Sequence, residues 1–298
     1  MRAVLFLLAV LGAAKAWHPT GHFLVALIAQ IELQRDNPEL FDKLEEIVGV
    51  LSPFTAENEH KFVECAEFPD DIKYQNWKAF DSWHFSDHYI FSGVDPKPMP
   101  DNKENMMWAM LKAIRNLNTN KPSKINQMLG KSFSLRYLIH LVGDIHQPLH
   151  NTSRVTPNFP KGDLGGNLFK IKFPGVYDLH TFWDMCLKKY DEVRTPLDQD
   201  KFDYLLNIAK ELMEEFPRNK FRDRLADTKF ENWSLEGSAL AEKVAYDSIE
   251  PYTTPSQEYI DRGFAVVKEQ LALGGYRLTD VLSKLKIENS SIISLEDK

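Results

Sequence analysis

Residues 138–150 read LIHLVGDIHQPLH, and this stretch places several metal-binding side chains around the end of a helix. His140 and Asp144 are four residues apart, so on a helix they project from one face and can share a metal ion. The residue before Pro148 is pushed away from the α region, which ends the helix there. His150 follows this break and is free to turn back toward the same cluster. The stretch therefore predicts a helix that carries metal ligands at its C-terminal end.

A second pair repeats this spacing, because His180 and Asp184 are four residues apart in LHTFWD. A lone His–Asp pair is more typical of a hydrogen bond on a helix surface than of a metal site. Two pairs and a histidine beyond a helix break favour a multinuclear zinc site, since imidazole and carboxylate groups bind zinc and a carboxylate can bridge two ions. His146 lies off the face of the first pair, and we expect it to support the ligands or the fold without binding metal itself.

Long segments of the chain have helical periodicity. Helices are predicted at residues 21–33, 105–117, 133–145, 204–216, 235–248, 256–271 and 278–285. Gly274 and Gly275 predict a break before the last of these helices. Residues 167–173 alternate between polar and apolar side chains and predict one half of a small β-hairpin near residues 167–178. The sequence thus predicts an all-α fold, in which residues 17–298 form a single, mainly helical domain.

The first sixteen residues have the pattern of a secretory signal peptide. A positively charged start is followed by 12 apolar residues at 3–14, too few to span a bilayer, which takes about 20. Ala14 and Ala16 provide the small residues of a cleavage site, so Trp17 is the expected first residue of the mature chain. No later stretch has the length of a membrane anchor. We therefore expect a protein that is secreted or delivered to a vacuole-like lumen.

Two kinds of modification fit such a compartment. Cys65 and Cys186 can form a disulfide bond where conditions are oxidising. Asn151, Asn232 and Asn289 begin the tripeptides NTS, NWS and NSS, which are glycosylation acceptors. Each tripeptide is a weak signal by itself, because such sequences arise often by chance.

The composition restricts how the protein meets other molecules. The chain has 36 Lys and Arg against 43 Asp and Glu, which gives a formal net charge of −7. This balance argues against binding nucleic acid or anionic membranes through a general basic surface. Two cysteines are too few for a disulfide-rich scaffold or a four-cysteine zinc site. Bound zinc would still give an acidic protein one focused positive point for an anionic substrate.

Four features together resemble the zinc-dependent, single-strand-preferring nucleases of fungi and plants, the nuclease S1/P1 family. They are Trp17 at the predicted mature terminus with His22 five residues later, the block HLVGDIHQPLH, the tripeptide GGN at residues 165–167, and LHTFWD. The resemblance extends from Trp17 to ALGGYRL at residues 272–278, which is nearly the whole mature chain.

This resemblance implies a mainly α-helical protein that binds three Zn²⁺ ions. The implied metal ligands are Trp17, His22, Asp70, His84, His140, Asp144, His150, His180 and Asp184. Asp144 would be shared by two ions, and Trp17 would bind through its free α-amino nitrogen and its carbonyl oxygen. Asp70 follows Phe-Pro, where the family usually has Trp-Ala, so Asp71 is an alternative ligand.

The resemblance also implies an activity, that of an endonuclease and 3′-nucleotidase. Its substrates would be single-stranded DNA, RNA and 3′-nucleotides, and its products would carry 5′-phosphates. The implied catalytic residues are Asp70, Lys73 and Asp144, of which Asp70 would orient the nucleophile and Lys73 would steady the phosphoryl charge. We expect a monomer that needs neither a membrane nor a protein partner.

The implied base-binding residues are Phe85 and Asp87 in HFSD and Asn167 in GGN. Stacking on an aromatic ring tolerates any base but requires an unstacked nucleotide, which explains a preference for single strands.

Two other functions remain open from the sequence. A zinc phospholipase C shares the N-terminal Trp and the HxxxDxxxxxH block, although its first His lies further from the Trp and its last ligand is usually Glu, where this chain has Asp184. The second alternative is a catalytically inactive secreted zinc-binding protein. The feature that favours it is His18, which is unusual at the second position of the mature chain. Hydrolysis assays on nucleic acid and lipid discriminate among the three.

Overall fold

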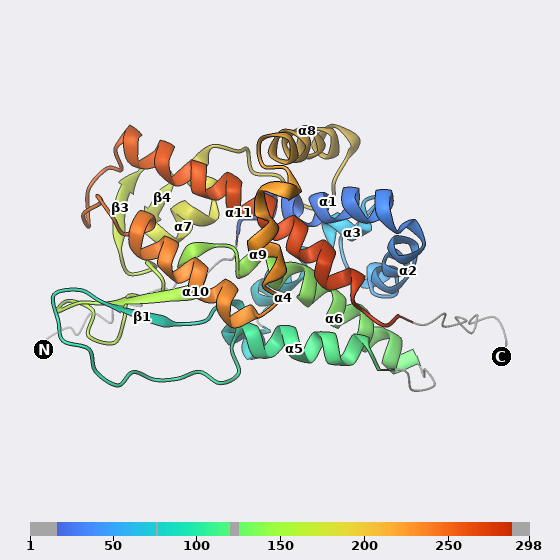
Figure 1. Ribbon diagram of the computed structural model, residues 1–298, viewed down its shortest axis with the longest axis horizontal. Helices are drawn as coiled ribbons and strands as arrows, with labels where there is room; N and C mark the ends of the chain where they lie inside the picture. The colour runs from blue at the N-terminus through green and yellow to red at the C-terminus, as the bar shows by residue number, and fades with distance from the viewer. Residues whose placement is uncertain (1–16, 76, 120–124, 288–298) are drawn as a thin grey trace, which may run out of the picture.

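A computed structural model describes residues 17–75, 77–119 and 125–287, which form mostly helices (Figure 1). The predicted signal peptide, residues 1–16, and the tripeptide at Asn289 lie outside the described residues. The α-helices are α1 Pro19–Asp36, α2 Pro38–Gly49, α3 Lys61–Glu64, α4 Phe68–Tyr74, α5 Met106–Leu117, α6 Ile125–Asp144, α7 Leu179–Asp184, α8 Gln199–Glu215, α9 Arg222–Ala226, α10 Phe230–Leu240 and α11 Gln257–Ser283. Short 3₁₀ turns that matter for the site are η2 Lys78–His84, η3 Pro148–Asn151 and η4 Cys186–Lys188, and a π-helical turn, η6 Ala241–Ala245, continues α10. The mainly helical fold is confirmed.

The central helix is α1, which is apolar on every side over residues 23–29. Its residues 23–29 are all buried, as expected for a helix that is surrounded by others. It packs against α11, α8 and α6, and Figure 1 shows α8 above it and α5 with α6 below. His22 is carried on the first turns of this helix and is therefore held in the middle of the molecule.

The predicted helix break at Gly274 and Gly275 is wrong, because α11 continues from Gln257 to Ser283 without interruption. The glycines allow a close approach of α11 to α1 instead. A Cβ atom on Gly275 would lie 2.5 Å from the Cβ of Ile28, and one on Gly274 would lie 3.3 Å from Val25 Cγ2. Two glycines in a helix thus indicate tight helix packing here.

The other predicted helices are confirmed with shifted ends. Residues 105–117, 133–145, 204–216 and 256–271 fall almost entirely within α5, α6, α8 and α11. Residues 235–245 are divided between α10 and the π-helical turn η6, and residues 246–248 lie beyond the helix. Helix α6 ends at Asp144, a few residues before Pro148, and a turn then leads into η3, which contains His150.

Two small sheets accompany the helices. The predicted hairpin is formed by β3 Lys170–Phe173 and β4 Val176–Asp178, which pair antiparallel. A parallel pair that the sequence did not predict joins β1 His88–Phe91 to β2 Thr152–Val155. This pair brings the segment after η2 beside the segment after η3, and thereby brings His84 and His150 together.

The structure bears on two of the predicted modifications. Cys65 and Cys186 are buried free thiols, so their predicted pairing is wrong, and the Cys65 thiol instead donates to the carbonyl of Phe62. Asn151 is fully buried and its amide nitrogen donates to the carbonyls of Ile145 and Gln147, so this tripeptide is not accessible to glycosylation in the folded chain.

Among the residues described, no helix is both long enough and apolar enough to cross a bilayer.

Candidate metal centre

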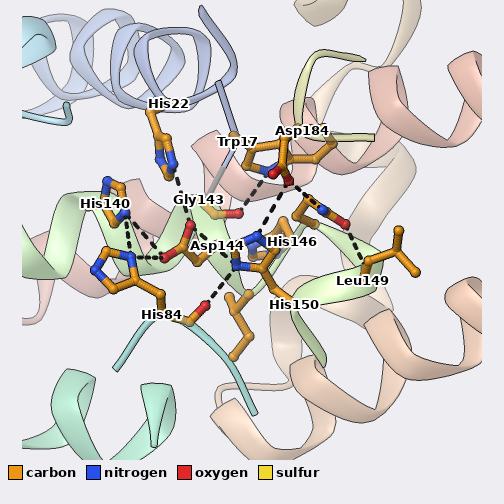
Figure 2. A network of polar contacts seen from close by, with 12 residues as sticks. Trp17, His22, His84, His140, Gly143, Asp144, His146, Leu149, His150 and Asp184 are labelled. Atoms are coloured by element: carbon orange, nitrogen blue, oxygen red, sulfur yellow. Dashed lines mark hydrogen bonds and ion pairs between the residues drawn. The ribbon is translucent and has the colours of Figure 1, made fainter. Parts of the chain in front are cut away.

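Asp144 lies at the centre of the site and is completely buried at the end of α6 (Figure 2). Its Oδ2 atom is 3.1 Å from His84 Nδ1 and 3.2 Å from His140 Nε2. Its Oδ1 atom is 3.4 Å from His22 Nε2 and 3.7 Å from His150 Nδ1. A carboxylate with imidazoles against both oxygens has the geometry of a ligand that two metal ions share.

The structure brings together every predicted ligand side chain. Three sets each offer one ligand atom per residue, and within a set these atoms lie within 4.8 Å of one another. The sets are His22, His140 and Asp144; Asp70, His84 and His140; and His150, His180 and Asp184. Six separate elements contribute them, namely α1, α4, η2, α6, η3 and α7.

Asp70, rather than Asp71, belongs to these sets among the described residues. Its Oδ1 atom is 3.7 Å from His84 Nδ1 and 3.3 Å from the ammonium of Lys73. Burial opposes ionisation of Asp70, but the charges of Lys73, His140 and His84 hold its pKa below the usual range. Burial, together with Glu67 and Asp70, raises the pKa of the neighbouring Asp71 to about 7. Asp70 is thus the carboxylate with cationic partners.

Backbone carbonyls orient three of the histidines. In each, Nδ1 donates to a carbonyl oxygen 2.7 Å away, which places the lone pair of the neutral ring on Nε2, the nitrogen that would bind a metal. The pairs are His140 with Ala66, His150 with His84, and His180 with Gly165.

Buried polar atoms without partners indicate that the donor set fits metal ions. Both ring nitrogens of His22, Nε2 of His84, Oδ1 of Asp144 and Oδ2 of Asp184 are buried and have no hydrogen-bond partner. Such atoms are costly to bury unless something compensates them, and a cation compensates both imidazole lone pairs and carboxylate oxygens. Burial lowers the pKa of His22 and of His84 to about 4, with help from His140 and Lys73 respectively. Both imidazoles are therefore neutral near pH 7, as metal binding requires.

Two glycines permit this crowding. A Cβ atom on Gly143 would lie 2.6 Å from His22 Nδ1, so the helix backbone approaches the ring as closely as glycine allows. Gly165 has a φ of +60° and its added Cβ would lie 2.4 Å from the carbonyl oxygen of Leu149. Glycine adopts this conformation readily, and Gly165 presents the carbonyl that orients His180.

Trp17 is fully buried beside the cluster, and its indole nitrogen donates to the carbonyl of Gly143 at 2.9 Å (Figure 2). His18 is directed elsewhere, because its Nε2 atom is 2.9 Å from a carboxylate oxygen of Glu192. The backbone nitrogen of His18 donates to the carbonyl of Asp184. The start of the described chain is thus tied to two of the ligand-bearing helices, α6 and α7.

The three predicted base-binding residues lie in the segments that adjoin the cluster. Phe85 directly follows η2, and Asp87 directly precedes β1. Burial, and secondarily Asp163, raises the pKa of Asp87 to about 6. Asn167 lies in the loop that begins with Gly165, and its amide nitrogen donates to the carbonyl of Leu164. Base recognition by these three residues stays a prediction.

Other residues around the ligands carry structural contacts. His146 lies outside the three sets, as expected, and donates from Nδ1 to the carbonyl of Val142. Sequence reasoning missed the contribution of Gly143 and of Gln147, whose amide donates to Asp184. Both residues are inside the block at 138–150, but only the packing of α1 and α7 around it reveals their contacts.

Comparisons with known proteins agree with this geometry. Residues 17–286 match the family model described as S1/P1 Nuclease. Endonuclease 3 of Arabidopsis thaliana is 27% identical over 304 residues, which cover 95% of this chain and 93% of that protein. Nuclease P1 of Penicillium citrinum is 22% identical, covering 90% of this chain and 97% of that protein. Nuclease S1 of Aspergillus oryzae is 24% identical over 49% of this chain and 51% of its own length. With the match spanning all the ligand-bearing elements, the chain belongs to the S1/P1 nuclease family.

Proposed function

We propose that this chain is a secreted endonuclease and 3′-nucleotidase that binds three Zn²⁺ ions. It hydrolyses phosphodiester bonds of single-stranded DNA and RNA and leaves 5′-phosphates on its products. The observation that carries the proposal is the placement of Asp144 between four imidazoles, with two further carboxylates, Asp70 and Asp184, in the same site. The S1/P1 family is zinc-dependent and acts as phosphodiesterases on single-stranded nucleic acid, and this chain retains each side chain of the implied ligand set.

The ligand sets support three ions. Asp70, His84, His140 and Asp144 would hold one ion, and His150, His180 and Asp184 would hold another. The third would be bound by His22, Asp144 and the terminal nitrogen and carbonyl oxygen of Trp17, which is next to them in Figure 2. This last site requires cleavage after Ala16, because an α-amine binds a metal and an amide nitrogen does not.

The protein side chains have distinct tasks in the reaction. What bound zinc supplies is positive charge, which activates water and stabilises the charge on the phosphoryl group and on the leaving oxygen. Asp70 accepts a hydrogen bond from the attacking water and orients it. Lys73, whose ammonium is 3.3 Å from Asp70, adds positive charge beside the phosphoryl oxygens. Phe85, Asp87 and Asn167 bind the neighbouring base, which has to be unstacked to reach an aromatic ring.

Secretion and a monomeric state complete the proposal. Residues 1–16 have the pattern of a signal peptide, and Trp17 at the predicted cleavage point is buried beside a metal set. Each of the three ligand sets is formed by side chains of this one chain, which supports a monomeric enzyme.

A substrate comparison tests this function. The purified chain is incubated with single-stranded DNA, single-stranded RNA, a 3′-nucleotide and phosphatidylcholine, each with and without a chelator. We expect hydrolysis of the nucleic acids and of the 3′-nucleotide, and its loss when zinc is removed. Hydrolysis of the lipid alone would establish a phospholipase instead, and hydrolysis that survives the chelator would exclude the zinc site.

A further inference from the structure

Gln147 lies in the turn between α6 and η3 and is completely buried. Both ends of its side chain are used. Its Oε1 atom accepts a hydrogen bond from the backbone nitrogen of Leu149, and its Nε2 atom donates a hydrogen bond to Asp184 Oδ1. The distance between donor and acceptor is 2.6 Å in both. Asp184 belongs to α7, so this one amide joins the turn that carries His150 to the helix that carries His180 and Asp184.

The hydrogen bond fixes which way the Asp184 carboxylate faces. With Oδ1 engaged by Gln147, the other oxygen, Oδ2, is buried without a hydrogen-bond partner and lies 3.4 Å from His180 Nε2. His150 approaches the same carboxylate from the turn, with its Nε2 atom 3.4 Å from Oδ1. A neutral amide donor suits this place, because it orients a carboxylate without adding a charge that competes with a cation.

We propose that Gln147 is a positioning residue that holds the Asp184 carboxylate in place for the zinc ion bound by His150, His180 and Asp184. This inference rests on the proposed function, since it concerns one of the three ions. Removing the amide lowers the affinity for that ion selectively, because Gln147 touches no carboxylate or imidazole of the other two sets in the contacts described. Partners that orient metal ligands typically contribute a factor of about 10 to 100 in metal affinity.

A second amide in the same turn provides a matched control. Asn151 is buried like Gln147, but its amide nitrogen donates to the carbonyls of Ile145 and Gln147 and to no ligand side chain. Gln147→Met and Asn151→Leu each replace a buried amide with an apolar group of similar shape. Both variants loosen the turn, whereas only the first removes a hydrogen bond to a metal ligand.

The experiment measures zinc retained per chain against a series of chelators of known affinity. We expect Gln147→Met to lose one of three ions at about 10- to 100-fold higher free zinc than the wild type, with the other two unchanged. Its activity should return when free zinc is raised by the same factor. Asn151→Leu should have a lower Tm but wild-type affinity for all three ions. If Gln147→Met does not fold, Gln147→Asn replaces it in the experiment. This variant keeps the amide but shortens its reach, and it should show the same loss of one ion.

Two results would overturn the inference alone. One is wild-type affinity for all three ions in Gln147→Met or, where that variant does not fold, in Gln147→Asn. The other is an equal fall in the affinity for all three ions, which would show a general loss of packing. A wild-type chain that retains no zinc would overturn the proposed function and the inference with it.

Discussion

Replacing Gly143 by alanine tests the geometry of the metal centre with a single methyl group. The new Cβ atom would lie 2.6 Å from His22 Nδ1 and 3.0 Å from His22 Cε1. Ordinary contact is 3.4–4 Å, so the ring has to move by about 0.8 Å or more. The ring is also stacked on His140 with 3.8 Å between centroids, and it is almost completely buried, so it has no free space to move into.

The magnitude follows from the tolerance of metal and catalytic sites. A displacement of about 1 Å in such a site costs on the order of 100-fold in rate. Helix propensity acts in the opposite direction, because Gly→Ala within a helix stabilises by about 1 kcal/mol. We therefore expect Gly143→Ala to lose about 100-fold in kcat on a single-stranded oligonucleotide while the protein stays folded.

Gly130→Ala in the same helix is the matched control. Its Cβ atom would lie 3.6 Å from Asn116 Nδ2, which is an ordinary contact. This variant should keep wild-type activity and be equally or more stable in urea. Wild-type kcat in Gly143→Ala would refute the close approach of α6 to His22, and an equal loss in Gly130→Ala would show that the effect is not local.

Three further predictions follow from the site and the core. Asp144→Asn should reduce hydrolysis by at least about 1,000-fold at unchanged far-UV circular dichroism, because the shared carboxylate loses its charge; near-normal turnover would remove Asp144 from the site. Gly275→Ala should lower the free energy of unfolding by about 1–3 kcal/mol in urea, because its Cβ atom would lie 2.5 Å from the branched Ile28 side chain; an unchanged midpoint would contradict this packing. Burial and Asp163 raise the pKa of Asp87 from 3.8 to about 6, so the fold loses stability as pH rises from about 4 through 6. Asp87→Asn should thus be more stable than the wild type by about 1–3 kcal/mol at pH 7.5 and about equal at pH 3.5, measured by urea unfolding of the zinc-free protein; the same difference at both pH values would contradict the shifted pKa.

Much of the ligand set could be predicted because the spacing of its residues along the chain indicates which side chains share a helix face. His140 with Asp144 and His180 with Asp184 are each four residues apart, and the helices α6 and α7 do place each pair on one face. His22, Asp70 and His84 stand alone in the sequence, so only their resemblance to a family pattern identified them. Their convergence depends on contacts between elements far apart in the chain.

The errors have a common physical origin, because tertiary packing decided features that local sequence left open. Gly274 and Gly275 predict a break by local rules, but the packed surface of α1 makes small residues necessary within a continuous helix. The parallel pair β1–β2 has four residues in each strand, and no local pattern links strands so distant in sequence. The tripeptide at Asn151 matches a glycosylation acceptor, but the turn uses its amide for internal hydrogen bonds.

The packing of α1 against α11 joins the first and last helices of the described chain. During synthesis, a nascent chain emerges from the ribosome with α1 long before α11 is available to cover it. Contacts between such distant segments form late in folding, since the intervening chain must be ordered first. A nascent chain without α11 lacks the surface that buries α1 and fixes His22 beside Asp144. The metal centre of this nuclease is therefore completed only after α11 has been synthesised and has packed on α1.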